Sequence, residues 1–158
     1  MKQVLFVCMG NLCRSPIAEA VAKRMAVREG LERKLRFASA GTHPPRRGEP
    51  ADPRARQVGK ARGYDLSGHR ARKLEAADFR RFDWVFAMDN QNFADLMRAC
   101  PPEETRRLQR FLDPLGNPEL TEVPDPYFGS LSGFERVFDL CEAGLASIFR
   151  EVRQSGLD

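Results

Sequence analysis

A cysteine and an arginine lie six positions apart near the start of the chain. Cys8 ends an apolar run over residues 4–7, and Arg14 is followed directly by Ser15 and Pro16. A thiolate is a nucleophile for phosphorus, and a guanidinium binds the oxygens of a tetrahedral oxyanion through paired hydrogen bonds. This spacing predicts a short loop that holds a phosphate group over Cys8.

The elements on either side of this loop explain how it would work. Residues 2–7 are expected to form a buried strand, and a helix is expected from Ser15, as N-cap, to about Glu29. Backbone N–H groups of such a loop can point inward, and the helix adds its positive end, which favours the thiolate form of Cys8. A lone cysteine after a strand is usually a small buried side chain, but this combination favours a catalytic cysteine. The predicted phosphate-binding residues are Met9, Gly10, Asn11, Leu12, Cys13, Arg14 and Ser15.

The rest of the chain alternates strands and helices. Further strands are expected over 35–41, 83–89 and 107–113, helices over 54–62, 90–100 and 134–153, and loops over 42–53 and 114–133. This alternation predicts an α/β fold with a parallel sheet covered by helices on both faces. Ligands of such folds bind beyond the carboxyl ends of the strands, which is where Cys8 is expected.

Length and composition indicate one soluble domain over residues 1–158, with 42% hydrophobic and 30% charged residues. No apolar run approaches the roughly 18 residues of a membrane helix, and the N-terminus does not read as a secretory signal, so a cytoplasmic protein without a membrane partner is expected. The four cysteines then do not predict disulfides. With two histidines and no C-x-x-C pair, neither a metal site nor a cofactor is expected.

The formal net charge of +4 raises the question of nucleic acid. The arginines come in scattered pairs without a recognisable DNA- or RNA-binding motif, so a solvated basic surface is the better interpretation and no nucleic-acid partner is expected. A positive field would still attract phosphorylated substrates.

The motif "VCMGNLCRSP" is followed in order by "SAGT" (39–42), "DPRA" (52–55), "GHRAR" (68–72), "FAMDNQN" (86–92) and "VPDPYFG" (123–129). This ordered set resembles the low-molecular-weight protein tyrosine phosphatases over nearly the whole chain. The resemblance implies a three-layer, flavodoxin-like or Rossmann-like fold with a four-stranded parallel sheet. It also implies metal-independent hydrolysis of phosphotyrosine and small aryl phosphates through a phosphocysteine on Cys8. The expected partner is a phosphotyrosine-containing protein, and the expected state is a monomer or a weak homo-oligomer.

A leaving oxygen needs a proton, and Asp125, between Pro124 and Pro126, is the predicted general acid. Asp-Pro is also a common turn signal, which recurs at Asp52 and Asp113. The resemblance, rather than local chemistry, selects Asp125 as the third catalytic residue beside Cys8 and Arg14.

The resemblance also implies supporting and wall residues. Leu12 and Tyr127 would enclose an aromatic ring, and the predicted supporting residues are Asn11, Ser15, Ser39, His69 and Asp89. Cys13 would protect Cys8 through a reversible disulfide, or would simply pack under the loop. Two features depart from many relatives: "HPPRR" (43–47) lacks an aromatic residue, and Tyr127-Phe128 stands in place of tandem tyrosines.

Other chemistries remain open on this fold. An arsenate reductase would relay a disulfide through further cysteines, but Cys100 and Cys141 are 41 positions apart. A phosphate carrier would be phosphorylated on Cys8 and would not need Asp125. Relatives that act on phosphoarginine carry threonine where Leu12 stands, which argues against that activity.

Overall fold

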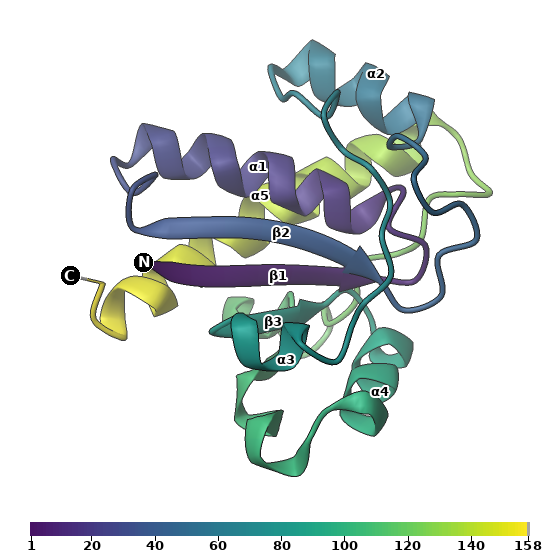
Figure 1. Ribbon diagram of the computed structural model, residues 1–158. Coiled ribbons are helices and arrows are strands. Elements are labelled where there is room, and N and C mark those ends of the chain that lie inside the picture. Colours follow the sequence, from purple (N-terminus) through teal and green to yellow (C-terminus); the bar gives the residue numbers. More distant parts are fainter. Residues whose placement is uncertain (158) are drawn as a thin grey trace.

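A single parallel sheet organises the chain, with its strands in the order β2-β1-β3-β4 (Figure 1). The computed structural model of the protein describes residues 1–157. The strands are β1 (Lys2–Cys8), β2 (Leu35–Gly41), β3 (Trp84–Ala87) and β4 (Leu108–Arg110). The helices are α1 (Arg14–Arg28), α2 (Pro53–Arg62), α3 (Asp78–Arg81), α4 (Asn90–Ala99) and α5 (Leu131–Gln154), with 3₁₀ turns η1 (Pro102–Arg107) and η2 (Asp113–Leu115).

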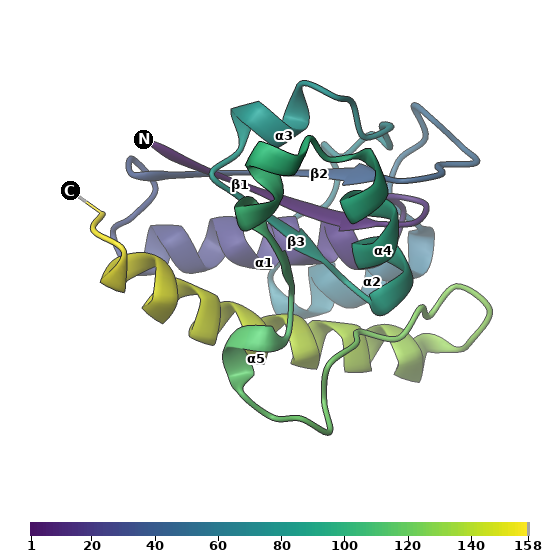
Figure 2. The ribbon, with the colours of Figure 1, turned by 90° about the horizontal axis from the view of Figure 1, so that it is seen from below.

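Helices cover both faces of the sheet, which gives three layers. Helices α1, α2 and α5 lie on one side and α3 and α4 on the other (Figures 1 and 2). Strand β1 is buried from Val4 to Cys8 because it is sandwiched between these layers and between two neighbouring strands. The predicted four-stranded parallel α/β fold is confirmed.

Residues 9–13 follow β1 at the carboxyl edge of the sheet. Strand β1 pairs with β2 over its full length, so that Cys8 stands opposite Gly41, and it pairs with β3 from Val4 to Val7. Loops after these strands therefore converge around Cys8, while the N-terminus and the C-terminal end of α5 lie at the opposite end of the sheet in both views.

Several element boundaries differ from those expected. Helix α1 begins at Arg14 with Cys13 at the N-cap, so the prediction of Ser15 as the N-cap is wrong. The Ser15 hydroxyl contacts Cys8 and Asn11 instead, and Pro16 falls at the third helical position, where an N–H would also lack a partner within the helix. Strands β3 and β4 are shorter than expected, because the chain turns away at the carboxyl edge to build the site.

Helix α5 begins at Leu131, three residues before the expected start at Phe134. Its first turn is largely exposed and carries no apolar pattern, so periodicity could not reveal it. Helix α3 was not expected, since four residues are too few to show a period. Among residues 1–157, no helix has the length and apolar character to cross a membrane.

Candidate active site

The backbone of residues 8–13 forms a cradle around the thiol of Cys8. The carbonyl oxygens of Cys8, Met9 and Leu12 accept hydrogen bonds from the N–H groups of Thr42, His43 and Asp52, at 3.0, 2.9 and 2.9 Å. In a planar trans peptide the N–H group points opposite to the carbonyl. With the carbonyls bonded outward to the 42–52 segment, the following N–H groups face the centre of the loop and form an anion-binding nest.

Asn11 shapes the loop from within. It is the one non-glycine residue among those described with a positive φ, 57°, a conformation that asparagine tolerates better than most residues. Its buried amide group donates to the Ser15 and Ser39 hydroxyls at 2.9 and 3.0 Å, and its carbonyl Oδ1 accepts from the N–H of Arg72 at 2.9 Å. These contacts fix the turn that aims the loop inward.

Two groups of the loop and of helix α1 approach the sulfur of Cys8. The N–H of Asn11 donates to Sγ at 3.2 Å, and the Ser15 hydroxyl lies 2.9 Å from Sγ. Helix α1 begins directly after the loop, so its N-terminus adds positive potential at the sulfur. The sulfur of Cys8 is therefore surrounded by groups that can stabilise negative charge on it.

Arg14 lies beneath the opening of the cradle with a side chain only 4% exposed. Its Nη1 donates to Asp89 Oδ2 at 2.7 Å and to the carbonyl of Val123 at 3.0 Å. Burial lowers the pKa of Arg14, but Cys8 and the hydrogen bond to Asp89 outweigh this and raise the pKa above its ordinary value. The guanidinium is therefore a fixed cation, pre-oriented toward the bound anion.

Asp89 serves two elements at once. Its Oδ1 accepts from the N–H of Asn92 and caps helix α4, while Oδ2 holds Arg14. A carboxylate after β3 thus connects the layer of α4 to the active-site loop.

Asp125 approaches the same cation from the long loop before α5. Its Oδ2 lies 3.8 Å from Arg14 Nη2, and its Oδ1 accepts from the N–H of Tyr127 at 3.1 Å. The Asp125 side chain is 41% exposed, so its carboxyl group can exchange protons with water and still reach the pocket.

A pocket of about 270 Å³ opens above Cys8. Leu12 and Tyr127, the two residues expected as walls, both line this pocket together with the loop and Arg14. The full lining comprises Cys8, Met9, Gly10, Leu12, Cys13, Arg14, Pro45, Arg46, Asp125, Tyr127 and Phe128.

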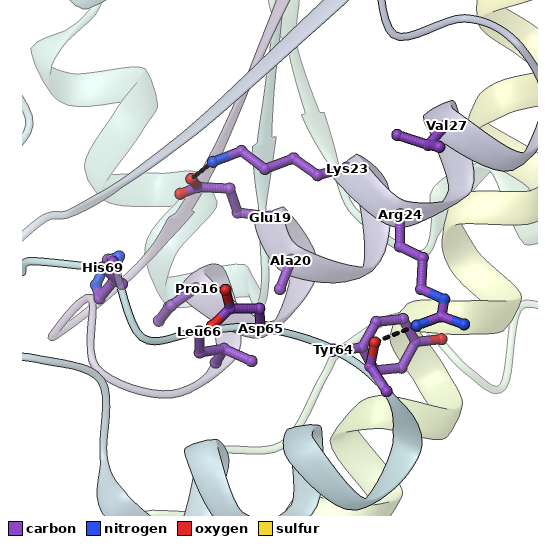
Figure 3. A pocket seen from close by; sticks show the side chains of 12 residues that line it. Pro16, Glu19, Ala20, Lys23, Arg24, Val27, Tyr64, Asp65, Leu66 and His69 are labelled. Carbon is purple, nitrogen blue, oxygen red and sulfur yellow. Dashed lines mark hydrogen bonds and ion pairs between the residues drawn. The ribbon is translucent and has the colours of Figure 1, made fainter.

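Behind the loop, Ser39 and His69 support Asn11. The Ser39 hydroxyl, which accepts from Asn11, donates to Glu19 Oε1 at 2.7 Å, and His69 Nε2–H donates to the Asn11 carbonyl at 2.7 Å. Burial lowers the pKa of His69, so the ring is neutral near pH 7. Glu19 and His69 also line a second pocket of about 500 Å³ between α1 and the 63–69 segment (Figure 3).

Cys13 is a buried free thiol that also lines the pocket. Burial raises its pKa, and the nearby carboxylate of Asp52 raises it further. Cys13 therefore stays protonated at neutral pH and is a weak nucleophile itself.

The sequence did not single out several residues that the structure brings to the site. Phe128, 95% exposed, adds a second aromatic ring at the pocket mouth, and Pro45 and Arg46 occupy the side that lacks an aromatic residue. Glu19 extends the network behind Asn11, and Arg54 bonds the loop that carries Asp125. Phe128 follows Tyr127 in "VPDPYFG" and Arg54 lies within "DPRA", so both could have been found there, whereas Glu19 carries no local signal.

Among residues 1–157, no group of three or more His, Cys, Asp or Glu side chains could hold a metal ion. The positive charge at the pocket comes from the side chains of Arg14 and Arg46, and the N-terminus of α1 adds positive potential.

Comparison with known proteins agrees with this geometry. The family described as "Low molecular weight phosphotyrosine protein phosphatase" matches residues 3–156. The chain is 37% identical over 155 residues to the low molecular weight protein-tyrosine-phosphatase YfkJ of Bacillus subtilis, covering 96% of this chain and 98% of that one. It is 37% identical over 143 residues to the human low molecular weight phosphotyrosine protein phosphatase, with 89% of each covered.

Solved structures give the same result. A protein tyrosine phosphatase from Entamoeba histolytica with Hepes in its active site superposes with a TM-score of 0.94 at 39% identity, covering 98% of this chain and 99% of that one. The crystal structure of YfkJ gives a TM-score of 0.92 at 34% identity, with 98% and 96% covered. The chain belongs to the low molecular weight phosphotyrosine protein phosphatase family.

Proposed function

We propose that Cys8, Arg14 and Asp125 carry out the protein-tyrosine phosphatase reaction of this chain, with phosphotyrosine in proteins and small aryl phosphates as substrates. The observation that carries the assignment is the cradle itself: inward N–H groups and a buried guanidinium surround one sulfur. Such an arrangement binds a phosphate group and presents its phosphorus to the thiolate.

In the first step the thiolate of Cys8 attacks phosphorus in line with the leaving oxygen. The S–P bond forms as the P–O ester bond breaks, and Asp125, in its acid form, gives its proton to the departing phenolic oxygen. The products are the free phenol and a phosphocysteine. Arg14 and the loop N–H groups stabilise charge on the equatorial oxygens throughout.

In the second step the Asp125 carboxylate removes a proton from water. The hydroxide oxygen attacks phosphorus, the S–P bond breaks, and inorganic phosphate leaves with Cys8 restored as a thiolate. The Ser15 hydroxyl, 2.9 Å from Sγ, can donate to the sulfur and stabilise it as the leaving group.

In both steps Arg14 and the loop N–H groups stabilise the negative charge on the phosphoryl oxygens, so the proposed mechanism does not use a metal ion. The Asp89 carboxylate and the Val123 carbonyl hold Arg14 in place before substrate arrives, so no reorganisation of the guanidinium is required during the reaction.

The pocket supports an aromatic substrate. Leu12 and Tyr127 offer faces to a phenyl ring, and the exposed Phe128 extends this apolar wall outward. A phosphoserine side chain is shorter and has no ring to occupy this space.

The supporting roles of Asn11, Ser15, Ser39, His69 and Asp89 follow from their hydrogen bonds to the loop or to Arg14. For Cys13 we propose a disulfide with Cys8 under oxidation, with two sulfurs on one short loop as its support. The remaining residues of the loop, Met9, Gly10 and Leu12, would bind phosphate through their N–H groups.

We further propose that residues 1–158 act as one catalytic domain in the cytoplasm. The family match over residues 3–156 supports one domain, and the need for a free thiol at Cys8 supports a reducing compartment. A monomer or weak homo-oligomer is the expected state, which analytical ultracentrifugation would measure.

Hydrolysis of 4-nitrophenyl phosphate in excess chelator tests the mechanism. We expect turnover by the wild type, none by Cys8→Ser, and a rate reduced by ~10²–10⁴-fold in Asp125→Asn, the usual contribution of a general acid. Trapping of ³²P on cysteine after acid quench checks the intermediate. Unchanged activity of Cys8→Ser would refute the proposal. An inactive wild type would direct the test to arsenate reduction.

A further inference from the structure

The side chain of Arg54 donates hydrogen bonds to the loop that carries the proposed general acid, Asp125. Its Nη2 donates to the carbonyl of Tyr127 at 2.7 Å, and its Nη1 donates to the carbonyl of Gly129 at 3.0 Å. The guanidinium lies 4.6 Å from the ring centroid of Phe134 in α5 and 5.7 Å from that of Tyr127. The planar guanidinium thus binds two backbone carbonyls of residues 127–129 and packs on two aromatic rings, which fixes this part of the loop.

The other side of Arg54 is bonded to Asp52. Arg54 Nε and Nη2 donate to Asp52 Oδ1 and Oδ2 at 3.1 and 2.9 Å. The Asp52 carboxylate also caps α2, and its side chain is only 7% exposed. Burial raises the pKa of Asp52, but its hydrogen bonds with Arg54 lower it below the ordinary value, so the pair stays ionised near pH 7.

Asp52 is in turn attached to the phosphate-binding loop. Its N–H donates to the carbonyl of Leu12 at 2.9 Å. A continuous set of hydrogen bonds therefore runs from Leu12 through Asp52 and Arg54 to Tyr127. The N–H of Tyr127 completes it by donating to Asp125 Oδ1 at 3.1 Å.

We propose that Arg54 is a positioning residue for the general acid. It holds the 125–129 turn at a fixed place relative to the phosphate-binding loop, so that Asp125 lies beside Arg14, 3.8 Å from Nη2. Asp125 is 41% exposed, and its own contacts in the loop are local, so this placement depends on the bond to Arg54. The inference rests on the proposed function, because it assigns a residue that acts through Asp125.

Loss of this positioning has a kinetic signature that simple destabilisation lacks. A misplaced acid slows expulsion of weakly acidic phenols and has little effect on strongly acidic phenols, which leave without a proton. The value of kcat/KM covers the steps up to phosphocysteine formation, so it reads this effect directly.

The experiment compares phenyl, 4-nitrophenyl and 2,4-dinitrophenyl phosphate with the full-length protein. We expect Arg54→Ala to lose ~10–100-fold in kcat/KM on phenyl phosphate, since a displacement of about 1 Å can cost 10²-fold. The loss on 2,4-dinitrophenyl phosphate should be much smaller. Arg56→Ala is the matched control: Arg56 is exposed on the same helix, its Nε donates to Ala51, and its kinetics should equal those of the wild type.

Two further variants separate geometry from charge and from general damage. Arg54→Lys keeps the charge but lacks the planar guanidinium that binds Asp52 and both carbonyls. It should therefore show the same steep dependence on the leaving group as Arg54→Ala. In an Asp125→Asn background, Arg54→Ala should cause no additional loss, because the group that it positions is already absent. Circular dichroism melts identify the temperature at which each variant is folded, and kinetics are measured well below it.

An equal loss on all three phosphates, full activity of Arg54→Lys, or an additive loss in the Asp125→Asn background would overturn the inference. Failure of the proposed function looks different. In that case Asp125→Asn itself would show no dependence on the leaving group, or Cys8→Ser would remain active.

Discussion

The substitution Gly41→Ala tests whether the backbone of the proposed phosphate-binding loop packs directly against β2, so that one added methyl group displaces it. Gly41 ends β2 beside Cys8, and a Cβ built there would lie 2.7 Å from the Met9 carbonyl oxygen and 3.1 Å from the Gly10 carbonyl carbon. Favourable contacts between non-bonded heavy atoms begin at about 3.5 Å, so the loop backbone must move by roughly 0.5–1 Å in Gly41→Ala.

The magnitude follows from two effects of this movement. Overpacking of a tightly packed region costs ~1–3 kcal/mol, which the free energy of unfolding in urea measures. The N–H groups that face the anion move with the backbone, and a displacement near 1 Å can cost up to about 10²-fold in rate. We expect kcat/KM on 4-nitrophenyl phosphate to fall by ~10–100-fold and the inhibition constant of inorganic phosphate to rise.

Gly68→Ala is the control, because a Cβ there has no atom within 4 Å. Its stability and kinetics should match those of the wild type. Gly41→Ala with wild-type phosphate affinity and kcat/KM, measured where the protein is folded, would refute the reasoning that the loop rests directly on β2.

Three other changes have distinct expected outcomes. Asn11→Ala removes three side-chain hydrogen bonds, two of them buried, and an asparagine at φ 57°. Urea unfolding should therefore show a loss of ~2–4 kcal/mol, and a loss below ~1 kcal/mol would contradict this account. Gly144→Ala places a Cβ 2.6 Å from Phe111 Cε2 and should cost ~1–3 kcal/mol with kcat/KM unchanged at 25 °C; a large kinetic loss would show that this region of the core controls the site. Burial lowers the pKa of folded His69 below its ordinary 6.5, so the unfolded chain binds the proton first as the pH falls. The stability advantage of the wild type over His69→Gln, measured by urea unfolding, should therefore shrink below pH 6.5. A constant difference between pH 8 and pH 5 would contradict this.

The sequence predicts the strand, loop and helix around Cys8 well because the signals for them are local. The apolar strand, Cys8, Arg14 and the following helix lie within one continuous segment, and this segment folds as a strand, a loop and a helix. The alternation of elements likewise predicts the parallel sheet. Boundaries were less accurate where tertiary contacts compete with local preference: Ser15 has good N-cap chemistry, yet its hydroxyl contacts Cys8 and Asn11.

Asp125 illustrates the limit of local reasoning. Asp52 and Asp113 precede prolines just as Asp125 does, and only the family resemblance distinguished them. In the folded chain the three have different surroundings: Asp52 pairs with Arg54, Asp113 pairs with Arg110, and Asp125 reaches Arg14. Arg54 is two residues after Asp52 and Arg110 is three residues before Asp113, so these two partners are local. Arg14 is distant in the sequence from Asp125, and packing alone brings them together, so local sequence cannot show this contact.

The same argument applies to the basic residues. The chain has 26 lysines and arginines, and the sequence analysis placed Arg54 within "DPRA" without assigning it a role. Its contacts come from Asp52, two residues away, and from Tyr127, Gly129 and Phe134, more than seventy positions away. These segments meet because loops and helix starts gather at the carboxyl edge of a parallel sheet. A sequence can therefore single out Cys8 as the proposed nucleophile, whereas the proposed positioning residue Arg54 becomes identifiable only once the sheet has brought the two loops together.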